Sequence, residues 1–448
     1  MVGIIGAGIS GLSLAYHLQK LNIPYILLEA SEQAGGYIRT VQDNSINRKT
    51  YVLEIGPNSI MVDGEIKQII EELGIGEELM ASNDVSQNRY IFKAGKYRKL
   101  PAKPSKLLFN GFFSFSSKIA IFKERRRPKQ NIDNETLSQF FERRFSKEIV
   151  EYALNPFVAG IYAGDPEQLL LAKTFPQLHQ YEQEYGSVIK GLVKNKSIER
   201  RQASSFKKGM QTLPNAFAQK LDHLKLGTKV TDIQKTERGY TIQANDDQTF
   251  EVQQLVVATA APAAEQFLSN AFPAFSSALG KIYYPPMVAV HSIYKRSAVK
   301  HPLDGFGGLN PKTEGLFTAG SIWTSSIFEG RCPEDEVLFT TFVGGSQSPE
   351  NTTNSKQITL GKVHQELATH YQISSSPLYR NMYKWDQAIP QYDLNILEAH
   401  QLADELEQKH FFVCANWKDG VSLPDSIKKG KKLAEKLAEK YQAKVVND

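Results

Sequence analysis

The first forty residues alternate apolar runs with glycine-rich or polar stretches. Val2–Ile5 is an apolar run, a glycine-rich turn follows at 6–11, and apolar residues then recur at helical spacing over Leu12–Leu21. A second apolar run, Tyr25–Leu28, ends at Glu29. This order of strand, glycine turn, helix, strand and acid predicts a βαβ unit that binds a dinucleotide.

Each part of this turn has a physical role in holding a pyrophosphate. Gly6 permits the tight turn, Gly8 lets the backbone approach the phosphates, and Gly11 lets the helix pack closely on the strand. The helix N-terminus presents N–H groups and a positive dipole end to the phosphates. Glu29 stands where a carboxylate accepts hydrogen bonds from a ribose.

Later apolar segments return the chain to this unit twice, so the cofactor domain is predicted to be discontinuous. Buried strands are expected at 255–259 and 411–415, a small sheet at 240–252, and a Lys-rich amphipathic helix at 425–443. We assign this domain to residues 1–86, 205–261 and 407–448. The predicted class is α/β, with a Rossmann-like cofactor domain.

Two insertions separate the three pieces of the cofactor domain. Residues 87–204 are predicted to be mostly helical, with helices at 136–145, 147–154 and 166–175. Residues 262–406 are richer in strands, the clearest at 288–294, 316–322 and 337–343, and we assign them to a substrate-binding domain.

The segment 104–122 mixes large apolar residues with lysines and serines, and three arginines follow at 125–127. Aromatic residues beside a basic run are typical of a helix or loop at a membrane interface. A core segment with a solvated charged end fits the pattern equally well. The apolar residues are Leu107, Leu108, Phe109, Phe112, Phe113, Phe115, Ile119, Ile121 and Phe122.

Composition and charge exclude some classes of protein but do not identify the function. The chain has 448 residues and a net charge of +5, so it has room for two or three domains, and nucleic acid is not an expected partner because no binding motif accompanies the charge. Its two cysteines, Cys332 and Cys414, are far apart, and no metal-ligand spacing is evident. The sequence has no run of eighteen apolar residues and no visible signal peptide, so we expect a cytoplasmic protein. If the segment 104–127 binds lipid, the protein would contact the membrane peripherally.

Motifs along most of the chain resemble those of the FAD-containing amine-oxidase and protoporphyrinogen-oxidase superfamily. A second glycine pair, Gly35-Gly36, follows the ribose acid, and NPFVAGIYAGDP at 155–166 resembles the PF-x-x-G-x-(Y/F)-A-G-D motif of oxygen-dependent protoporphyrinogen oxidases. Further matches are SFKKGMQTLP at 205–214, GFGGLNP at 305–311, TTFVGG at 340–345, WDQAIPQY at 385–392 and NWKDGVSL at 416–423.

The resemblance implies FAD as cofactor and a GR2-type dinucleotide fold. Trp385 is also implied near the flavin, where a buried core tryptophan is an almost equal alternative, and Lys418 is expected at the surface. The remaining residues implied in FAD binding are Gly6, Gly8, Ile9, Ser10, Gly11, Glu29, Ala30, Gly35, Gly36, Tyr37, Arg39, Gly56, Pro57, Asn58, Val230, Gly420, Val421 and Ser422.

The resemblance also implies a porphyrinogen substrate that is oxidised with O2 as acceptor. Arg89 matches an arginine that pairs with a substrate propionate, and the carbonyl of Gly160 matches one that faces the pyrrole N–H groups. The apolar residues Leu309, Ile322 and Phe342 match those that hold the macrocycle, although strand core alone would also account for them. No catalytic side-chain acid or base and no metal is expected, because the flavin carries the chemistry.

Several alternatives remain open at this stage. Protoporphyrinogen is preferred over coproporphyrinogen, whose four carboxylates should need more basic residues. Another amine oxidase or desaturase of the superfamily, or a non-enzymatic flavoprotein, is the more distant alternative. The sequence does not fix the oligomeric state, and a homodimer is one option.

Overall fold

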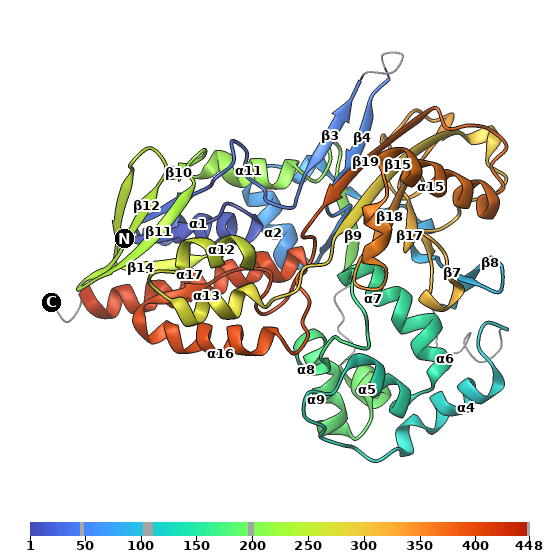
Figure 1. Cartoon of the computed structure of the whole chain (residues 1–448), viewed down its shortest axis with the longest axis horizontal. Helices are drawn as coiled ribbons and strands as arrows, with labels where there is room; N and C mark the ends of the chain where they lie inside the picture. Colours follow the sequence, from blue (N-terminus) through green and yellow to red (C-terminus); the bar gives the residue numbers. More distant parts are fainter. Residues whose placement is uncertain (45–48, 102–110, 196–200, 446–448) are drawn as a thin grey trace.

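The computed structural model describes residues 1–44, 49–101, 111–195 and 201–445, with side chains as far as Tyr441. It has two lobes side by side, one built on a parallel sheet and one on a large mixed sheet, and helices lie below the second (Figure 1). Both chain ends lie at the outer end of the first lobe.

The first lobe is centred on a parallel five-stranded sheet whose strands come from distant parts of the chain. The order is β10-β2-β1-β14-β20, and every pairing is parallel. The strands are almost continuously apolar because both faces of the sheet are covered. Their bounds are Leu224–Lys225, Tyr25–Leu28, Val2–Ile5, Gln254–Val257 and Phe411–Val413.

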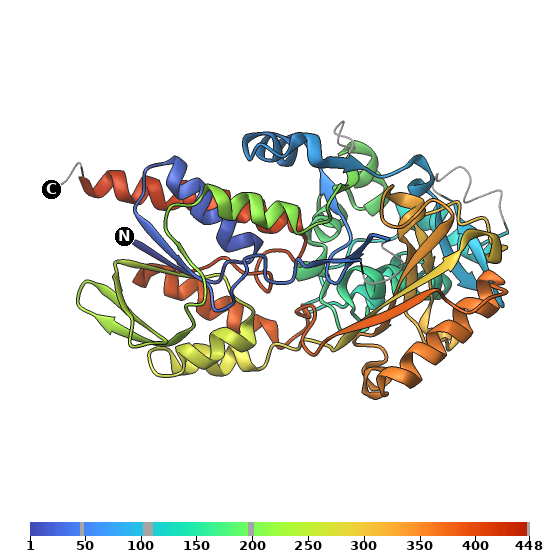
Figure 2. The same cartoon turned by 90° about the horizontal axis from the view of Figure 1, so that it is seen from above.

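Two layers cover this sheet (Figure 2). One face packs against α1 (Ile9–Lys20), α2 (Gly64–Glu72), α11 (Thr212–Lys220) and α17 (Leu423–Val445). The other packs against α12 (Ala261–Leu268), α13 (Pro273–Gly280), α16 (Ile396–Leu406) and a small sheet of β11 (Val230–Thr236), β12 (Gly239–Ala244) and β13 (Thr249–Val252).

The second lobe contains a seven-stranded sheet in the order β19-β15-β18-β17-β16-β7-β8. All its pairings are antiparallel except that between β16 and β7. One face carries a core under α15 (Lys356–Tyr371). In sheet order, the bounds are Tyr379–Trp385, Met287–Lys295, Glu336–Gly344, Gly320–Trp323, Gly307–Leu309, Arg89–Lys93 and Lys96–Leu100, and α14 (Thr324–Ile327) follows β17.

Smaller strands join the two lobes. The hairpin β3 (Thr40–Asp43) and β4 (Tyr51–Glu54) packs against the large sheet through Tyr51 and Leu53. A three-stranded sheet is formed by β5 (Ile60–Val62), β9 (Gln202–Phe206) and β6 (Leu79–Ala81).

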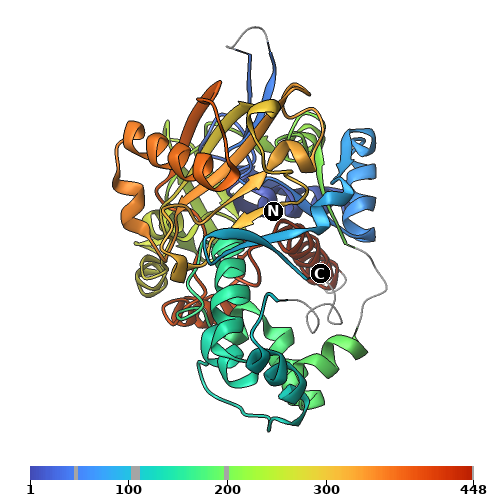
Figure 3. The same cartoon turned by 90° about the vertical axis from the view of Figure 1, so that its right-hand side faces the viewer.

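The helices below the large sheet form a separate group in the side view (Figure 3). A buried ion-pair network ties them together. Arg144 pairs with Glu124 and Glu182, and all three side chains are fully buried. The elements are α4 (Phe115–Lys123), α5 (Leu137–Arg144), α6 (Lys147–Ile149), a π-helical turn (Val150–Leu154), α7 (Asn155–Tyr162), α8 (Leu171–Thr174), α9 (Pro176–Tyr185) and α10 (Val188–Lys194).

Three predicted elements differ from the structure. Residues 89–100, expected within a helical insertion, form the hairpin β7–β8, which turns at Ala94-Gly95 with positive φ at both residues. Residues 166–170 are not helical, because this segment makes backbone hydrogen bonds with 135–138 instead. The strand expected at 316–322 begins only at Gly320.

Candidate functional site

The predicted phosphate turn lies at the carboxyl edge of the parallel sheet, where ligands of doubly wound folds bind. Gly6 has φ +103°, and a Cβ on Gly11 would lie 2.0 Å from the Gly6 carbonyl oxygen. A Cβ on Gly8 would have no neighbour within 4 Å. The two packing glycines are therefore sterically required, whereas Gly8 borders open space.

The N-terminus of α1 is open to an anion. Gly8 is its N-cap, no side chain caps it, and no acidic residue lies in its first turn. By contrast, α2 and α5 are capped by Asp63 and Thr136. The first turn of α1, which contains Ile9 and Ser10, can therefore present unpaired backbone N–H groups and a positive dipole end to a phosphate.

The second glycine pair meets the first turn directly. The Gly35 N–H donates to the Ala7 carbonyl at 2.9 Å. Gly36 has φ +59°, and a Cβ there would lie 3.3 Å from Gly8 Cα. Ala30, also predicted to contact FAD, is exposed just after β2. The two glycine-rich loops together form one concave surface of backbone atoms, which we call the cradle. Side chains in place of these glycines would occupy its space.

Glu29 is fixed from both sides but keeps acceptor capacity. Its carboxylate accepts from the Ala7 N–H at 2.7 Å and from the Ser31 hydroxyl at 2.7 Å. The Glu29 carbonyl accepts from Thr228 N–H at 2.7 Å, two residues before Val230. A carboxylate has about four lone-pair sites, so a ribose hydroxyl can still bind.

A third segment, 56–58, closes the cradle toward the large sheet. A Cβ on Gly56 would lie 1.9 Å from the Tyr37 carbonyl oxygen, so close backbone contact requires glycine here. Among the described residues, Asn58 Oδ1 is buried without a hydrogen-bond partner, which fits a polar group supplied by a ligand. Pro57 lies between them, and Arg39 is half-buried just before β3.

Aromatic rings line the passage from this cradle to the large sheet. Trp385 donates from Nε1 to the Ile55 carbonyl at 3.0 Å, and its ring lies 5.1 Å from that of Tyr37. Burial raises the pKa of Tyr37 to about 12, so its phenol stays protonated and donates to Gln387 O. Trp385 is half-buried, not a core tryptophan.

The C-terminal turn, 415–422, is anchored to the same edge through β20. Gly420 has φ +107°, and its N–H donates to the Tyr392 hydroxyl at 2.9 Å. The Ser422 hydroxyl accepts from Asp425 N–H and so caps α17. Val421, between them, packs partly against the core.

The four side chains predicted to bind substrate share one face of the seven-stranded sheet. Leu309 pairs with Gly320, which pairs with Phe342, and Ile322 is two residues beyond Gly320 on the same strand. Arg89 is two residues before Ile91, the register partner of Leu309. Because side chains of paired residues project from the same face, all four project away from the core under α15.

Helix α7 lies against this face. A Cβ on Gly160 would lie 2.9 Å from Leu309 Cδ2, so glycine permits the contact. The Gly164 N–H, which would pair with the Gly160 carbonyl in a continued helix, donates instead to Val158 at 3.5 Å. The Gly160 carbonyl is therefore released from its usual helical partner.

Arg89 stands at the rim of the face with its side chain exposed. Its guanidinium lies 4.0 Å from the centre of the Phe306 ring and donates to the Ser86 carbonyl. Among the described residues it makes no ion pair with a carboxylate. A planar guanidinium held in this way can receive a carboxylate in bidentate fashion.

Two buried titratable groups near the cradle were not singled out in the sequence. Burial raises the pKa of Glu54 to about 7 despite Arg331 at 3.7 Å, and burial lowers the pKa of His291 to about 4. Neutral His291 donates from Nε2 to the Glu54 carbonyl at 3.0 Å. No motif marks either group.

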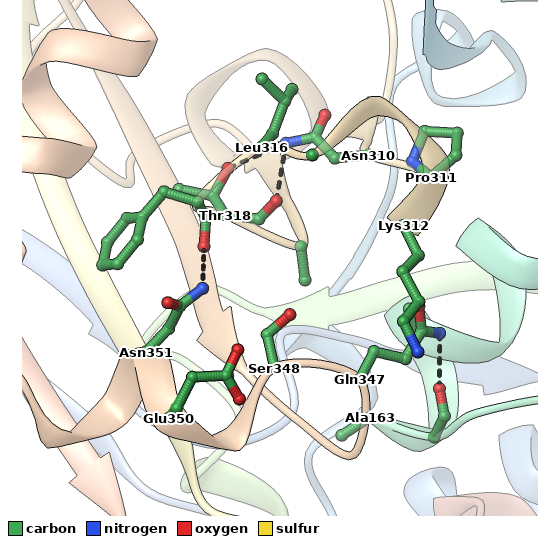
Figure 4. A pocket seen from close by; sticks show the side chains of 16 residues that line it. Ala163, Asn310, Pro311, Lys312, Leu316, Thr318, Gln347, Ser348, Glu350 and Asn351 are labelled. Carbon is green, nitrogen blue, oxygen red and sulfur yellow. Dashed lines mark hydrogen bonds between the residues drawn. The ribbon is translucent and has the colours of Figure 1, made fainter.

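A separate cavity of about 360 Å³ lies between α7, the loop 310–319 and the segment 344–351 (Figure 4). Its lining includes Asn310, whose amide donates to Thr318, and Gln347, which donates to the Gly164 carbonyl. None of the predicted FAD or substrate residues lines it. Within the described residues, no group of His, Cys, Asp and Glu could hold a metal ion.

Comparison with known proteins agrees with this geometry. The family model described as flavin containing amine oxidoreductase matches residues 9–438. The chain belongs to this family. It is accordingly a flavin-containing oxidoreductase, and the fold class predicted from the sequence is confirmed by the sheet topology and by solved structures of the same fold.

Its curated relatives include tetrapyrrole enzymes. Protoporphyrinogen oxidase, mitochondrial, of Nicotiana tabacum is 30% identical, over 96% of this chain and 93% of the relative. Coproporphyrinogen III oxidase of Bacillus subtilis is 27% identical, over 96% of both chains. A solved structure from Exiguobacterium, provisionally named a protoporphyrinogen oxidase, has a TM-score of 0.79 at 20% identity over 98% of both chains.

Two lysines lie near the C-terminal turn, one at a place that was not expected from the sequence and one that was not singled out in the sequence. Lys418, expected at the surface, is 8% exposed and pairs with Asp404 at 2.5 Å. Lys429, one of many lysines in its helix, directs its ammonium into the turn. The only sequence signal for this is Gly430, a glycine within a helix, which indicates close helix contact.

Proposed function

We propose that the protein is an FAD-dependent oxidase that converts protoporphyrinogen IX to protoporphyrin IX, with O2 as acceptor and hydrogen peroxide as by-product. The observation that carries this proposal is the common face formed by Arg89, Leu309, Ile322 and Phe342 beside the dinucleotide cradle. The relatives named protoporphyrinogen oxidase support the choice of substrate.

The cradle fits FAD in three respects. The α1 N-terminus is uncapped, Gly8 borders open space, and Asn58 Oδ1 is buried without a partner among the described residues. The chemistry that FAD supplies when bound is acceptance of a hydride from a bridge carbon of the porphyrinogen, followed by reoxidation with O2.

The residues of this chain bind, orient and shield the substrate. Arg89 holds one propionate, and Leu309, Ile322 and Phe342 present apolar surface to the macrocycle and exclude water. The free carbonyl of Gly160 accepts hydrogen bonds from pyrrole N–H groups. No side-chain acid or base acts in this scheme, because positioning one bridge carbon at the cofactor suffices for hydride transfer.

Coproporphyrinogen III is the second candidate substrate, favoured by the Bacillus subtilis relative. Anaerobically prepared porphyrinogens, offered separately to the holoenzyme in air, distinguish the two through the rise of porphyrin fluorescence. The proposal predicts a kcat/KM at least tenfold higher for protoporphyrinogen. A tenfold preference for coproporphyrinogen would make coproporphyrinogen the substrate. No turnover of either porphyrinogen would contradict the proposed function.

We also propose that α4 docks on an anionic membrane surface. Phe115, Ile119 and Phe122 are 78%, 36% and 64% exposed and recur at helical spacing along α4. The basic residues Lys123, Arg125 and Arg126 are exposed beside them, so charge complementarity favours anionic lipid.

The other apolar residues of this segment do not contribute to the exposed face of α4. Phe112 and Phe113 are core residues, and Leu107, Leu108 and Phe109 lie outside the described residues. Among the described residues, no helix is long and apolar enough to cross a bilayer.

Vesicle flotation tests this docking. We expect the wild-type protein to float with phosphatidylglycerol vesicles and the double variant Phe115→Ser, Phe122→Ser to remain at the bottom, since the variant removes most of the exposed apolar area of α4. Leu394→Ser is the matched control, because Leu394 is 58% exposed in the other lobe. Equal flotation of the double variant and the control would contradict docking by α4.

A further inference from the structure

The ammonium group of Lys429 is enclosed by backbone carbonyls of the C-terminal turn. Its Nζ donates to the carbonyl of Ala415 at 2.6 Å, to that of Lys418, and to that of Gly420 at 3.4 Å. An ammonium has three N–H donors, so these three carbonyls saturate it. Burial lowers the pKa of Lys429, as expected for a cation removed from water.

Two further carbonyls of the turn are also held from inside the protein. The Asn416 carbonyl accepts from the Tyr392 hydroxyl at 2.8 Å, and the Trp417 carbonyl accepts from His400 Nε2 at 2.6 Å. The turn is therefore fixed by side chains from the loop at Tyr392, from α16 and from α17. Two of the side chains on α17 are charged: Lys429, and Asp425, which accepts from the Ser422 hydroxyl at 2.5 Å. The Lys418 ammonium pairs with Asp404 on α16 at 2.5 Å and lies 3.9 Å from the carboxylate of Asp419.

This arrangement leaves the last two N–H groups of the turn free to bind a ligand. Among the described residues, the N–H groups of Val421 and Ser422 donate no hydrogen bond. They stand at the N-terminus of the 23-residue helix α17, where the helix dipole is positive. The α17 helix packs closely on the first turn of α1 at Gly430, whose Cβ would lie 2.9 Å from the Ser10 carbonyl oxygen.

We propose that Lys429 is a positioning residue for the flavin: it fixes the turn that presents Val421 and Ser422 N–H to the ring, and its charge favours the reduced, anionic cofactor. This inference rests on the proposed location of the flavin at 420–422. A fixed positive charge in a region of low dielectric stabilises added negative charge nearby, and the reduction potential rises accordingly.

The test compares Lys429→Met with Lys428→Met. The side chain of Lys428 pairs with Asp63 at 2.5 Å and with Glu65 at 3.4 Å, outside the turn, so its loss changes the charge of α17 equally without touching the turn. We expect Lys429→Met to weaken FAD binding by apoprotein at least tenfold. We also expect a tenfold lower equilibrium constant for flavin reduction, about 30 mV for a two-electron couple.

Each outcome has a defined meaning. Lys428→Met should leave both quantities within twofold of wild type. If Lys429→Met holds no flavin, Lys429→Gln, which keeps two N–H donors without the charge, gives the same measurement. A yellow Lys429→Met or Lys429→Gln protein with wild-type affinity and potential overturns the inference alone. A wild-type protein that stays colourless with added FAD overturns the proposed function instead.

Discussion

At the scale of single residues, the glycines of the cradle have different physical functions. Gly11 and Gly56 are required for the protein's own packing, because a Cβ would overlap a carbonyl oxygen in each case. Gly8 has an ordinary φ of −66° and open space beside it, so the polypeptide alone would accept alanine there. Only a ligand phosphate would meet the added methyl group.

Gly8→Ala is therefore expected to fold normally and to bind FAD at least tenfold more weakly, about 1.4 kcal/mol. Titration of apoprotein with FAD, followed by flavin fluorescence, gives the affinity, and thermal unfolding of the apoprotein gives the stability. Gly361→Ala is the control, since Gly361 lies within α15 with no neighbour within 4 Å of an added Cβ. Equal FAD affinity in the two variants would place the phosphates elsewhere.

Arg89 gives a second prediction at this scale. Arg89→Ala should retain FAD and raise KM for protoporphyrinogen about tenfold or more, because a charge-assisted hydrogen bond to a carboxylate contributes about 1.5–3 kcal/mol. Arg380→Ala is the control, because Arg380 pairs with Ser292 in a register that projects from the opposite face of the same sheet. A KM unchanged by the loss of Arg89 would remove this residue from the substrate site.

At the scale of elements, strand β15 couples the large sheet to the cradle through His291. Its folded pKa, about 4, lies below the ordinary value of 6.5, so the unfolded chain binds more protons between these pH values. The contribution of His291 to stability is therefore present above pH 6.5 and is lost as pH falls toward 4. Glu54 has a raised pKa and acts in the opposite direction, so only a comparison of variants isolates His291.

His291→Gln keeps an amide donor for the Glu54 carbonyl but does not titrate. Between pH 7 and pH 5 the wild-type protein should lose about 2 kcal/mol more stability than the variant, from this single group. Thermal unfolding midpoints at the two pH values measure the difference. Parallel decreases in both proteins would show that His291 is not held neutral by the fold.

Elements with a strong periodic pattern could be predicted from the sequence. Elements whose conformation depends on hydrogen bonds to distant segments of the chain could not. The helix at 9–20 and the strands at 25–28 and 287–295 follow the apolar period closely. Residues 166–170 have helical character in sequence, but they form a turn whose ends make hydrogen bonds with 135–138. The hairpin at 89–100 had a local signal in Ala94-Gly95, whereas its place beside β16 depends on tertiary pairing.

At the scale of the whole molecule, the site is assembled from segments far apart in the chain. The proposed cradle combines residues near 6–11, 35–37 and 56–58 with the turn at 415–422, and the proposed substrate face combines strands from 89 to 342. Motifs predict which residues take part. They could not predict that Lys429 enters the turn, because no local pattern distinguishes one lysine of a Lys-rich helix from the next.

The central claim is that electrons pass from a porphyrinogen on the large sheet to a flavin in the cradle. Anaerobic mixing of the yellow holoenzyme with protoporphyrinogen, followed by absorbance near the flavin band in a stopped-flow instrument, tests this directly. The account predicts rapid bleaching of the flavin together with the appearance of porphyrin absorbance, and recovery of the yellow colour when air is admitted. A flavin that stays oxidised with porphyrinogen in excess would contradict it.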